Sequence, residues 1–355
     1  MKALMRLSGR VADMGVAQTD EPILQQDDWA KMQVCYAGVC GGSDLKLMQM
    51  DATGPDAKLK PPIVLGHEFS GIITQVGPAV THLKPGDWVT VDTVVQPCGH
   101  CSYCVSGDWN MCPERLGVGS SFDGGFAPFF AGPARNFHVL PQGLPLRIGA
   151  LTEPAACAVH IVHDVAKVQA GERVVIIGPG VIGLLCAAAA LFAGAQVLVV
   201  GTPRGAQRLE CARAMGCQTL VNDTENLAAR VQAAFGGSAD AAVDAVGTNR
   251  ALQQAMYTLG KMGRLVAGGV PFKDKTPYQL DMDFVYRNQI SIGAGRSSRP
   301  SDWPIAMQVL KRFERQIDSW VDSHFTLDQW QQAFDQTRNK QVIKAMFTCA
   351  DEKGD

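Results

Sequence analysis

The chain has no long hydrophobic run, because its most apolar stretch, residues 181–195, is interrupted by glycine. A stretch of this length is too short for a membrane-spanning helix, which needs about 20 apolar residues. The chain also lacks an excess of charge of either sign, since its formal net charge is −2 at pH 7. Such a balance offers no basic surface for nucleic acid and no polybasic segment for a membrane surface. We therefore expect neither a nucleic-acid partner nor a membrane partner.

The first residues, MKALMRL, also lack the pattern of an export signal, because they turn polar at once and no small-residue cleavage site follows. The 355 residues include 11 cysteines. In a reducing compartment, metal binding or burial explains thiols better than disulfide bonds do. These features predict a cytoplasmic protein, and a chain of this length is expected to form two domains of roughly 100 to 200 residues each.

A short loop contains four of the cysteines, Cys98, Cys101, Cys104 and Cys112. This spacing suits one tetrahedral site in which zinc is bound by four sulfurs at roughly 2.3 Å. The loop has too few large apolar residues to fold without such a metal. The alternative, four unpaired or disulfide-bonded cysteines, fits the regular spacing less well. We predict a structural zinc site in a lobe of about residues 97–113, closed to substrate.

The sequence changes in character near residue 155. Residues 1–155 contain short apolar runs, such as 72–76 and 88–91, that are separated by Gly-Pro turns and are typical of a β-rich domain. Residues 156–292 alternate helical segments with fully apolar strands, which is the pattern of a doubly wound parallel sheet. The fold class predicted is therefore α/β, with a β-rich domain followed by a nucleotide-binding domain.

Six strands are expected in the second domain, at residues 173–177, 196–200, 219–221, 241–244, 263–267 and 289–292. Residues 293–355 are expected to return to the first domain with two helices, 301–315 and 327–337, and a last strand, 342–347.

The first of these strands leads into a glycine-rich turn and an alanine-rich helix. The turn reads Gly178, Pro179, Gly180, Val181, Ile182 and Gly183. In this strand, turn and helix context, GxGxxG is a dinucleotide-binding motif. Gly178 permits a tight turn, Gly180 lets the backbone approach a pyrophosphate, and Gly183 permits close helix packing. Backbone N–H groups at the start of the helix would then bind the phosphates.

The second strand bears on the choice between the two nicotinamide cofactors. An acidic residue at its end binds the ribose 2′-hydroxyl of NAD, but here the strand ends in Gly201, Thr202, Pro203 and Arg204. Arg204 could pair with a 2′-phosphate, or it could be a solvated loop charge. We expect NAD(P) as the cofactor, with NADP at least accepted.

A second zinc site is suggested by Cys40 and His67, each of which follows an apolar segment. A thiolate and an imidazole make half of a catalytic zinc site, and a carboxylate would complete the set of protein ligands. Two carboxylates are available, Glu153 in the motif Thr-Glu-Pro and Glu68 beside the histidine. The choice between these two glutamates is left open.

With these motifs in place, the chain resembles the zinc-containing medium-chain dehydrogenase/reductase family of alcohol, polyol and threonine dehydrogenases. The motifs that carry the resemblance are Gly66-His67-Glu68 with Gly71, the four-cysteine lobe, Glu153-Pro154, the glycine turn and residues 260–265. The resemblance implies a GroES-like catalytic domain, a Rossmann domain, two zinc ions per chain and a homodimer or homotetramer. The implied reaction is reversible transfer of a hydride from an alcohol carbon to a nicotinamide. A carboxylate ligand is more similar to the polyol and threonine dehydrogenases, and the resemblance implies Glu153 at the matching place, with Glu68 as the alternative ligand. The expected substrate is therefore a secondary alcohol of a polyol, sugar derivative or hydroxy amino acid.

The resemblance also implies roles for three residues after Cys40. Asp44 would orient a metal ligand, or serve as a turn aspartate. Ser43 would accept the substrate proton, although this chain carries an extra residue because Gly41 and Gly42 both precede it. Lys46 stands where many relatives have a histidine that passes the proton to solvent, and it can act so only with a lowered pKa.

Three other functions are less consistent with the sequence. A quinone-oxidoreductase-like reductase of the same superfamily would lack both zinc sites, and a zinc-ribbon nucleic-acid binder would need a basic surface. A family member without dehydrogenase activity would retain the fold, and the extra glycine is the feature that favours it.

Overall fold

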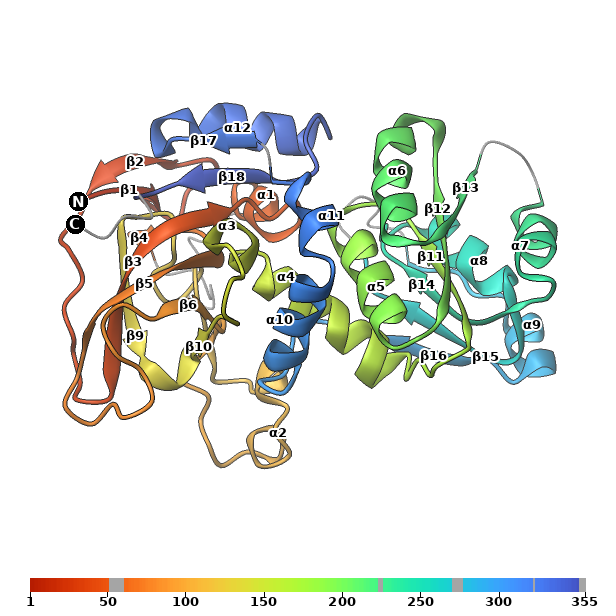
Figure 1. The fold of residues 1–355 in the computed structure, drawn as a ribbon, viewed down its shortest axis with the longest axis horizontal. Coiled ribbons are helices and arrows are strands. Elements are labelled where there is room, and N and C mark those ends of the chain that lie inside the picture. The colour runs from red at the N-terminus through yellow and green to blue at the C-terminus, as the bar shows by residue number, and fades with distance from the viewer. Residues whose placement is uncertain (51–60, 223–225, 270–276, 322, 351–355) are drawn as a thin grey trace. The chain divides into compact units, whose positions relative to one another are not determined.

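The computed structural model describes residues 1–50, 61–222, 226–269, 277–321 and 323–350. The chain forms two compact units (Figure 1). Unit 1 comprises Met1–Glu153 and Arg299–Asp355, and unit 2 comprises Pro154–Ser298. Within the described ranges, no helix has both the length and the apolar character needed to cross a bilayer.

Unit 1 is built around a seven-stranded sheet in the order β10-β6-β5-β3-β18-β17, with β9 also paired to β3. Its strands are β3 (Trp29–Gly38), β5 (Glu68–Val76), β6 (Trp88–Val91), β9 (Phe129–Pro133), β10 (Phe137–Val139), β17 (Ser323–Phe325) and β18 (Ala345–Thr348). β3 and β5 are antiparallel, and Gly38 pairs with Glu68. The residues that follow β3 therefore lie next to those that precede β5. β18 pairs with β3, so the C-terminal part of the chain completes this sheet.

Two small sheets and several short helices surround this sheet. The strands are β1 (Lys2–Arg6), β2 (Met14–Gln18), β4 (Ile63–Val64), β7 (Val94–Val95) and β8 (Leu116–Gly117). The helices are α1 (Ser43–Leu47), α2 (Ser102–Val105), α3 (Leu146–Gly149), α10 (Asp302–Arg312), α11 (Glu314–Asp318) and α12 (Trp330–Arg338). Aromatic rings fill the core between them, and the Phe126 and Phe347 rings meet edge to face with centroids 5.0 Å apart.

The predicted helix over 301–315 is interrupted in the structure. Phe313 leaves the helical conformation, with φ −109° and ψ 19°, and separates α10 from α11. Its side chain is buried, so packing of the aromatic ring takes precedence over helical continuity here. The next predicted helix, 327–337, begins with a 3-10 turn at Leu327–Gln329 before α12, because Thr326 and Gln329 form a capping box.

Unit 2 contains a six-stranded parallel sheet in the order β13-β12-β11-β14-β15-β16. The strands are β11 (Arg173–Ile177), β12 (Gln196–Gly201), β13 (Gln218–Val221), β14 (Ala239–Asp244), β15 (Leu259–Ala267) and β16 (Ser291–Ala294). In chain order this is the 3-2-1-4-5-6 arrangement of a doubly wound sheet, which confirms the predicted fold class. The apolar strands β11 and β12 are buried along most of their length, as a sheet with helices on both faces requires.

Helices link most of these strands. They are α5 (Val181–Phe192), α6 (Ala206–Met215), α7 (Leu227–Phe235), α8 (Asn249–Tyr257) and α9 (Met282–Asn288), and α4 (Thr152–Val159) with a following π-helix (His160–Val165) precedes the sheet. The last strand begins two residues later than predicted. Gln289 caps α9 with a φ of 49°, a left-handed conformation that cannot belong to a strand.

A buried histidine in unit 1 gives a pH-dependent prediction. His138 stacks on the Trp303 ring with centroids 5.1 Å apart, and burial together with the nearby His82 lowers the pKa of His138 to about 4. A histidine with a lowered pKa in the folded state stabilises the fold above its unfolded pKa, and this contribution is lost as the pH falls towards the folded pKa.

We expect the wild type to lose about 2 kcal/mol of unfolding free energy through His138 between pH 7 and pH 5. The variant His138→Phe has no group that titrates at this position, so its unfolding free energy should fall by about 2 kcal/mol less over the same pH range. Urea unfolding of both proteins at pH 7 and pH 5 would measure the difference. Equal losses in the wild type and the variant would contradict the prediction.

Candidate active site and zinc centres

The four cysteines of the lobe come together in space. The sulfurs of Cys98, Cys101, Cys104 and Cys112 all lie within 4.8 Å of one another, and those of Cys98 and Cys104 are 3.8 Å apart. Four sulfurs at zinc–sulfur distances of roughly 2.3 Å form a tetrahedron with edges of about 3.8 Å. The residues present therefore fit a closed zinc site.

Backbone N–H groups support this site by donating to the sulfurs. The Cys101 N–H lies 3.4 Å from the Cys98 sulfur, and the Cys104 N–H lies 3.4 Å from the Cys101 sulfur. Burial raises the pKa of the Cys112 thiol. Hydrogen bonds from the backbone N–H groups of Cys98 and Glu114 have the larger combined effect and help to lower this pKa to about 6. Donors of this kind favour thiolates, which are the form that binds zinc. The side chain of His100 is exposed and is not needed for a four-sulfur site.

The lobe is attached to the rest of unit 1 by charged contacts. Arg299, which precedes α10, forms an ion pair with Asp108 at 2.5 Å. The guanidinium of Arg135 lies over the Trp109 ring, 6.0 Å from its centroid. These contacts hold the part of the lobe that lies between its third and fourth cysteines.

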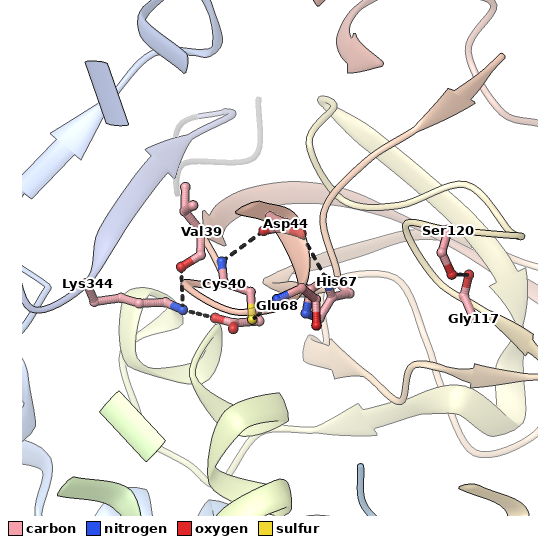
Figure 2. A network of polar contacts seen from close by, with 9 residues as sticks. Val39, Cys40, Asp44, His67, Glu68, Gly117, Ser120 and Lys344 are labelled. Carbon is pink, nitrogen blue, oxygen red and sulfur yellow. Dashed lines mark hydrogen bonds and ion pairs between the residues drawn. The ribbon is translucent and has the colours of Figure 1, made fainter. Parts of the chain in front are cut away.

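A second group of ligand atoms forms at the adjacent ends of β3 and β5. Cys40 follows β3, while His67 immediately precedes β5 and Glu68 begins it. Their ligand atoms lie within 4.8 Å of one another (Figure 2). A thiolate, an imidazole and a carboxylate are a donor set that binds zinc with a fourth position open to water or substrate. The pairing of Gly38 with Glu68 produces this proximity.

Asp44 holds two of these residues in place. One of its carboxylate oxygens accepts a 2.8 Å hydrogen bond from the Cys40 N–H, and the other lies 3.2 Å from Nδ1 of His67. Burial lowers the pKa of His67, but the charges of Asp44 and Cys40 raise it more, so it lies well above its ordinary value. An imidazole held at Nδ1 by a carboxylate presents Nε2 to a metal.

Glu68 is held by a lysine from the far end of the chain. Lys344 forms an ion pair with the Glu68 carboxylate and donates to the Val39 carbonyl at 2.9 Å (Figure 2). Both side chains are almost fully buried, at 3% and 2% exposed. Burial lowers the pKa of Lys344, but the Glu68 carboxylate raises it more. The lysine binds one Glu68 oxygen and leaves the other for a further partner.

Gly38 makes room for this ion pair. A Cβ atom at Gly38 would lie 2.6 Å from Cε of Lys344 and 2.9 Å from Oε2 of Glu68. Any side chain at Gly38 would therefore collide with both partners. In the sequence, the only signal of Lys344 is that it is a single charged residue within the otherwise apolar segment 342–347.

Glu153, the other candidate ligand, is not a member of the Cys40, His67 and Glu68 group. It lies in the first turn of α4, and its charge contributes to the raised pKa of Asp92. Burial is the larger cause of that shift, which brings the pKa of Asp92 to about 7.

Ser43 and Lys46 lie on α1 with exposed side chains, and the Ser43 N–H donates to the Cys40 sulfur at 3.3 Å. The two glycines before Ser43 form a turn that leads directly into the helix. Gly42 has a φ of −101°, so the turn places no demand there for the left-handed conformation that glycine allows.

The glycine motif of unit 2 forms the turn between β11 and α5. Gly178 has a φ of 101°, which favours glycine, and a Cβ at Gly183 would lie 1.9 Å from the Gly178 carbonyl oxygen. Gly180 caps α5, and Val181 and Ile182 begin it, so the N–H groups of this first turn are available to a phosphate. These features fit the binding of a dinucleotide pyrophosphate.

The end of β12 is tightly packed around Gly201. A Cβ at Gly201 would lie 3.0 Å from both Pro179 and Leu209. Thr202 and Arg204 are exposed, and Arg204 lies in the 3-10 turn Pro203–Gly205.

Comparison with known proteins agrees with this arrangement. Residues 26–142 match the alcohol dehydrogenase GroES-like domain, and residues 181–312 match the zinc-binding dehydrogenase model. The chain is 32% identical to D-arabitol-phosphate dehydrogenase of Enterococcus avium over 90% of each chain. It is also 32% identical to sorbitol dehydrogenase of Halalkalibacterium halodurans, over 99% of this chain and 100% of the relative.

Among solved structures, a zinc-binding dehydrogenase from Sinorhizobium meliloti 1021 bound to NADP superimposes with a TM-score of 0.84 at 26% identity, covering 98% of both chains. The residues of the site, the two domain matches and the full-length relatives agree. The chain is thus an oxidoreductase that belongs to the zinc-containing medium-chain dehydrogenase/reductase family.

Proposed function

We propose that the protein oxidises a secondary alcohol of a polyol or polyol phosphate to a ketone, with zinc in unit 1 and a nicotinamide cofactor bound by unit 2. The observation that carries this proposal is the convergence of Cys40, His67 and Glu68 into one donor group. The relatives named for D-arabitol phosphate and sorbitol support a polyol as the substrate class.

In this proposal each chain holds two zinc ions, one in the lobe and one at Cys40, His67 and Glu68. Glu68 is preferred over Glu153 as the third ligand because only Glu68 belongs to the group of donor atoms. Zinc bound there supplies Lewis-acid chemistry, which lowers the pKa of an alcohol so that its hydride is released more readily.

The residues around this site orient the ligands and move a proton. Asp44 fixes the tautomer of His67 and holds the Cys40 backbone. Ser43 would accept the alcohol proton, because it begins α1 immediately after the turn that follows Cys40. Lys46 or water would pass this proton to solvent, since the Lys46 side chain is exposed.

The site in unit 2 would bind NAD(P) through Gly178, Gly180 and the first turn of α5, and we propose that it accepts NADP. An acidic side chain at the end of β12 would repel a 2′-phosphate, and this chain has a tightly packed glycine, Gly201, at that position. The NADP-bound relative is consistent with this preference.

Arg204→Ala is therefore expected to raise the KM for NADP about tenfold, because one charge-assisted hydrogen bond to phosphate contributes about 1.5 to 3 kcal/mol. The KM for NAD should not change. Steady-state kinetics with both cofactors would measure the two values. An unchanged KM for NADP would show that Arg204 does not bind the 2′-phosphate.

The experiment that tests the proposed function is a screen of polyols, polyol phosphates, threonine and simple alcohols with both cofactors. Reduced nicotinamide absorbance reports turnover, and zinc content is measured on the same preparation. Activity is expected on at least one polyol or polyol phosphate. Silence on every substrate from a protein with two zinc ions per chain would instead indicate a family member without dehydrogenase activity.

We also propose a cytoplasmic homodimer or homotetramer. The thiolates required by both zinc sites suit a reducing compartment, and β16 is an edge strand with Ile292 at 43% exposure. A second copy pairing at this edge would cover it. Light scattering of wild type and Ile292→Asp would test this association.

A further inference from the structure

A buried arginine connects the N-terminal hairpin to the helix that follows Cys40. Arg6 ends β1 and is 0% exposed. Its guanidinium donates to the carbonyl of Leu47 at 2.6 Å and to that of Met50 at 2.7 Å. The same guanidinium also donates to the backbone carbonyls of residues 8–10. One side chain thus links the turn after β1 to the C-terminal end of α1.

The helix held in this way is too short to be stable alone. α1 has five residues, and isolated helices shorter than about 12 residues are marginal in water. Its position must therefore come from tertiary contacts, which include the packing of Leu45, Leu47 and Met48 against the core of unit 1 and polar contacts at both ends of the helix. A backbone hydrogen bond of 2.9 Å from the Ala12 N–H to the Met48 carbonyl adds to the contacts of Arg6 at the C-terminal end.

The opposite end of α1 belongs to the candidate zinc site. Asp44, in the first turn, holds the Cys40 N–H and His67. Asp44 and Leu47 lie one helical turn apart, so a shift of the C-terminal end would move the carboxylate as well.

The chemistry of the contact requires an arginine. A guanidinium has five N–H donors in a planar fork and can bind several carbonyls at once, whereas a lysine has a single nitrogen. Without the guanidinium, the half-buried carbonyls around it would lose their shared donor.

We propose that Arg6 is a positioning residue, which fixes α1 so that Asp44 and Ser43 remain aligned with Cys40 and His67. This inference rests on the proposed function for the role of the site, but the position of α1 can be measured separately.

The test compares Arg6→Lys and Arg6→Met with Arg147→Met, a control that removes an arginine of the same unit from its 2.7 Å ion pair with Asp318. Amide hydrogen exchange is measured over residues 44–50, together with zinc content and steady-state kinetics. We expect both Arg6 variants to exchange at least tenfold faster over residues 44–50, while β5 remains protected. Turnover should fall at least tenfold with little change in the KM for the cofactor, and Arg147→Met should match the wild type.

Wild-type exchange and turnover in a folded Arg6→Lys protein would overturn the proposal. Faster exchange spread evenly over unit 1 would also overturn the proposal, because such a result would show that Arg6 only stabilises the fold of the unit. If Arg6→Met does not fold, Arg6→Lys decides the outcome. If the wild type turns over no substrate, the proposed function fails, and hydrogen exchange with zinc retention still tests Arg6.

Discussion

Glu68→Gln protein is expected to purify with one zinc ion per chain and to turn over its substrate at least about 10³-fold more slowly than the wild type. The amide carries no negative charge for a metal, and it leaves the Lys344 ammonium buried without its carboxylate. Glu153→Gln, by contrast, should retain both zinc ions, because Glu153 lies outside the group of donor atoms. Elemental analysis and kinetics of the two variants measure the difference.

Lys344→Met separates the loss of the metal ligand from the loss of the ion pair. In metal-free protein the single variant leaves Glu68 buried without a cation, and breaking a buried pair in this way costs about 3 to 5 kcal/mol. In Glu68→Gln/Lys344→Met both charges are gone, so unfolding free energy should recover while activity does not. If Glu153→Gln loses one zinc and Glu68→Gln keeps both, the assignment of the third ligand is wrong.

Cys104→Ser is expected to lose the zinc of the lobe while the ion at Cys40, His67 and Glu68 remains. A serine hydroxyl is a poor replacement for a zinc thiolate, and the metal supplies most of the folding energy of such a loop. The thermal midpoint should fall by about 10 °C, and the lobe should become the first site of proteolysis. Calorimetry and mass spectrometry of the cleavage products measure these effects.

Cys211→Ser is the matched control, because Cys211 lies on α6 and belongs to no group of potential metal ligands in the described part of the chain. It should keep both zinc ions and the wild-type midpoint. A Cys104→Ser protein with two zinc ions and an unchanged midpoint would show that the lobe holds no structural metal.

Features that depend on local spacing could be predicted from the sequence. The four cysteines of the lobe and the glycines from Gly178 to Gly183 each lie within one loop or turn, so their spacing determines their geometry. The doubly wound sheet also follows from apolar strands that alternate with helices, and the structure confirms it.

Features that depend on long-range pairing could not be predicted. The choice between Glu68 and Glu153 stayed open because the register of β3 against β5 brings Glu68 beside Cys40, and no local pattern encodes that register. The partners Lys344 and Glu68 are 276 positions apart, and the contacts of Arg6 with α1 span more than 40 residues. Each of these residues, taken alone in the sequence, is an ordinary charged side chain.

The contact of Lys344 also affects the order in which this part of unit 1 can be assembled. The lysine precedes β18, near the end of the chain, and β18 pairs with β3 from the first forty residues. Cys40, His67 and Glu68 are therefore synthesised well before the lysine that holds the carboxylate, which follows Glu68 by 276 positions. Until Lys344 and β18 are in place, Glu68 lacks this partner and β3 lacks one of its neighbouring strands.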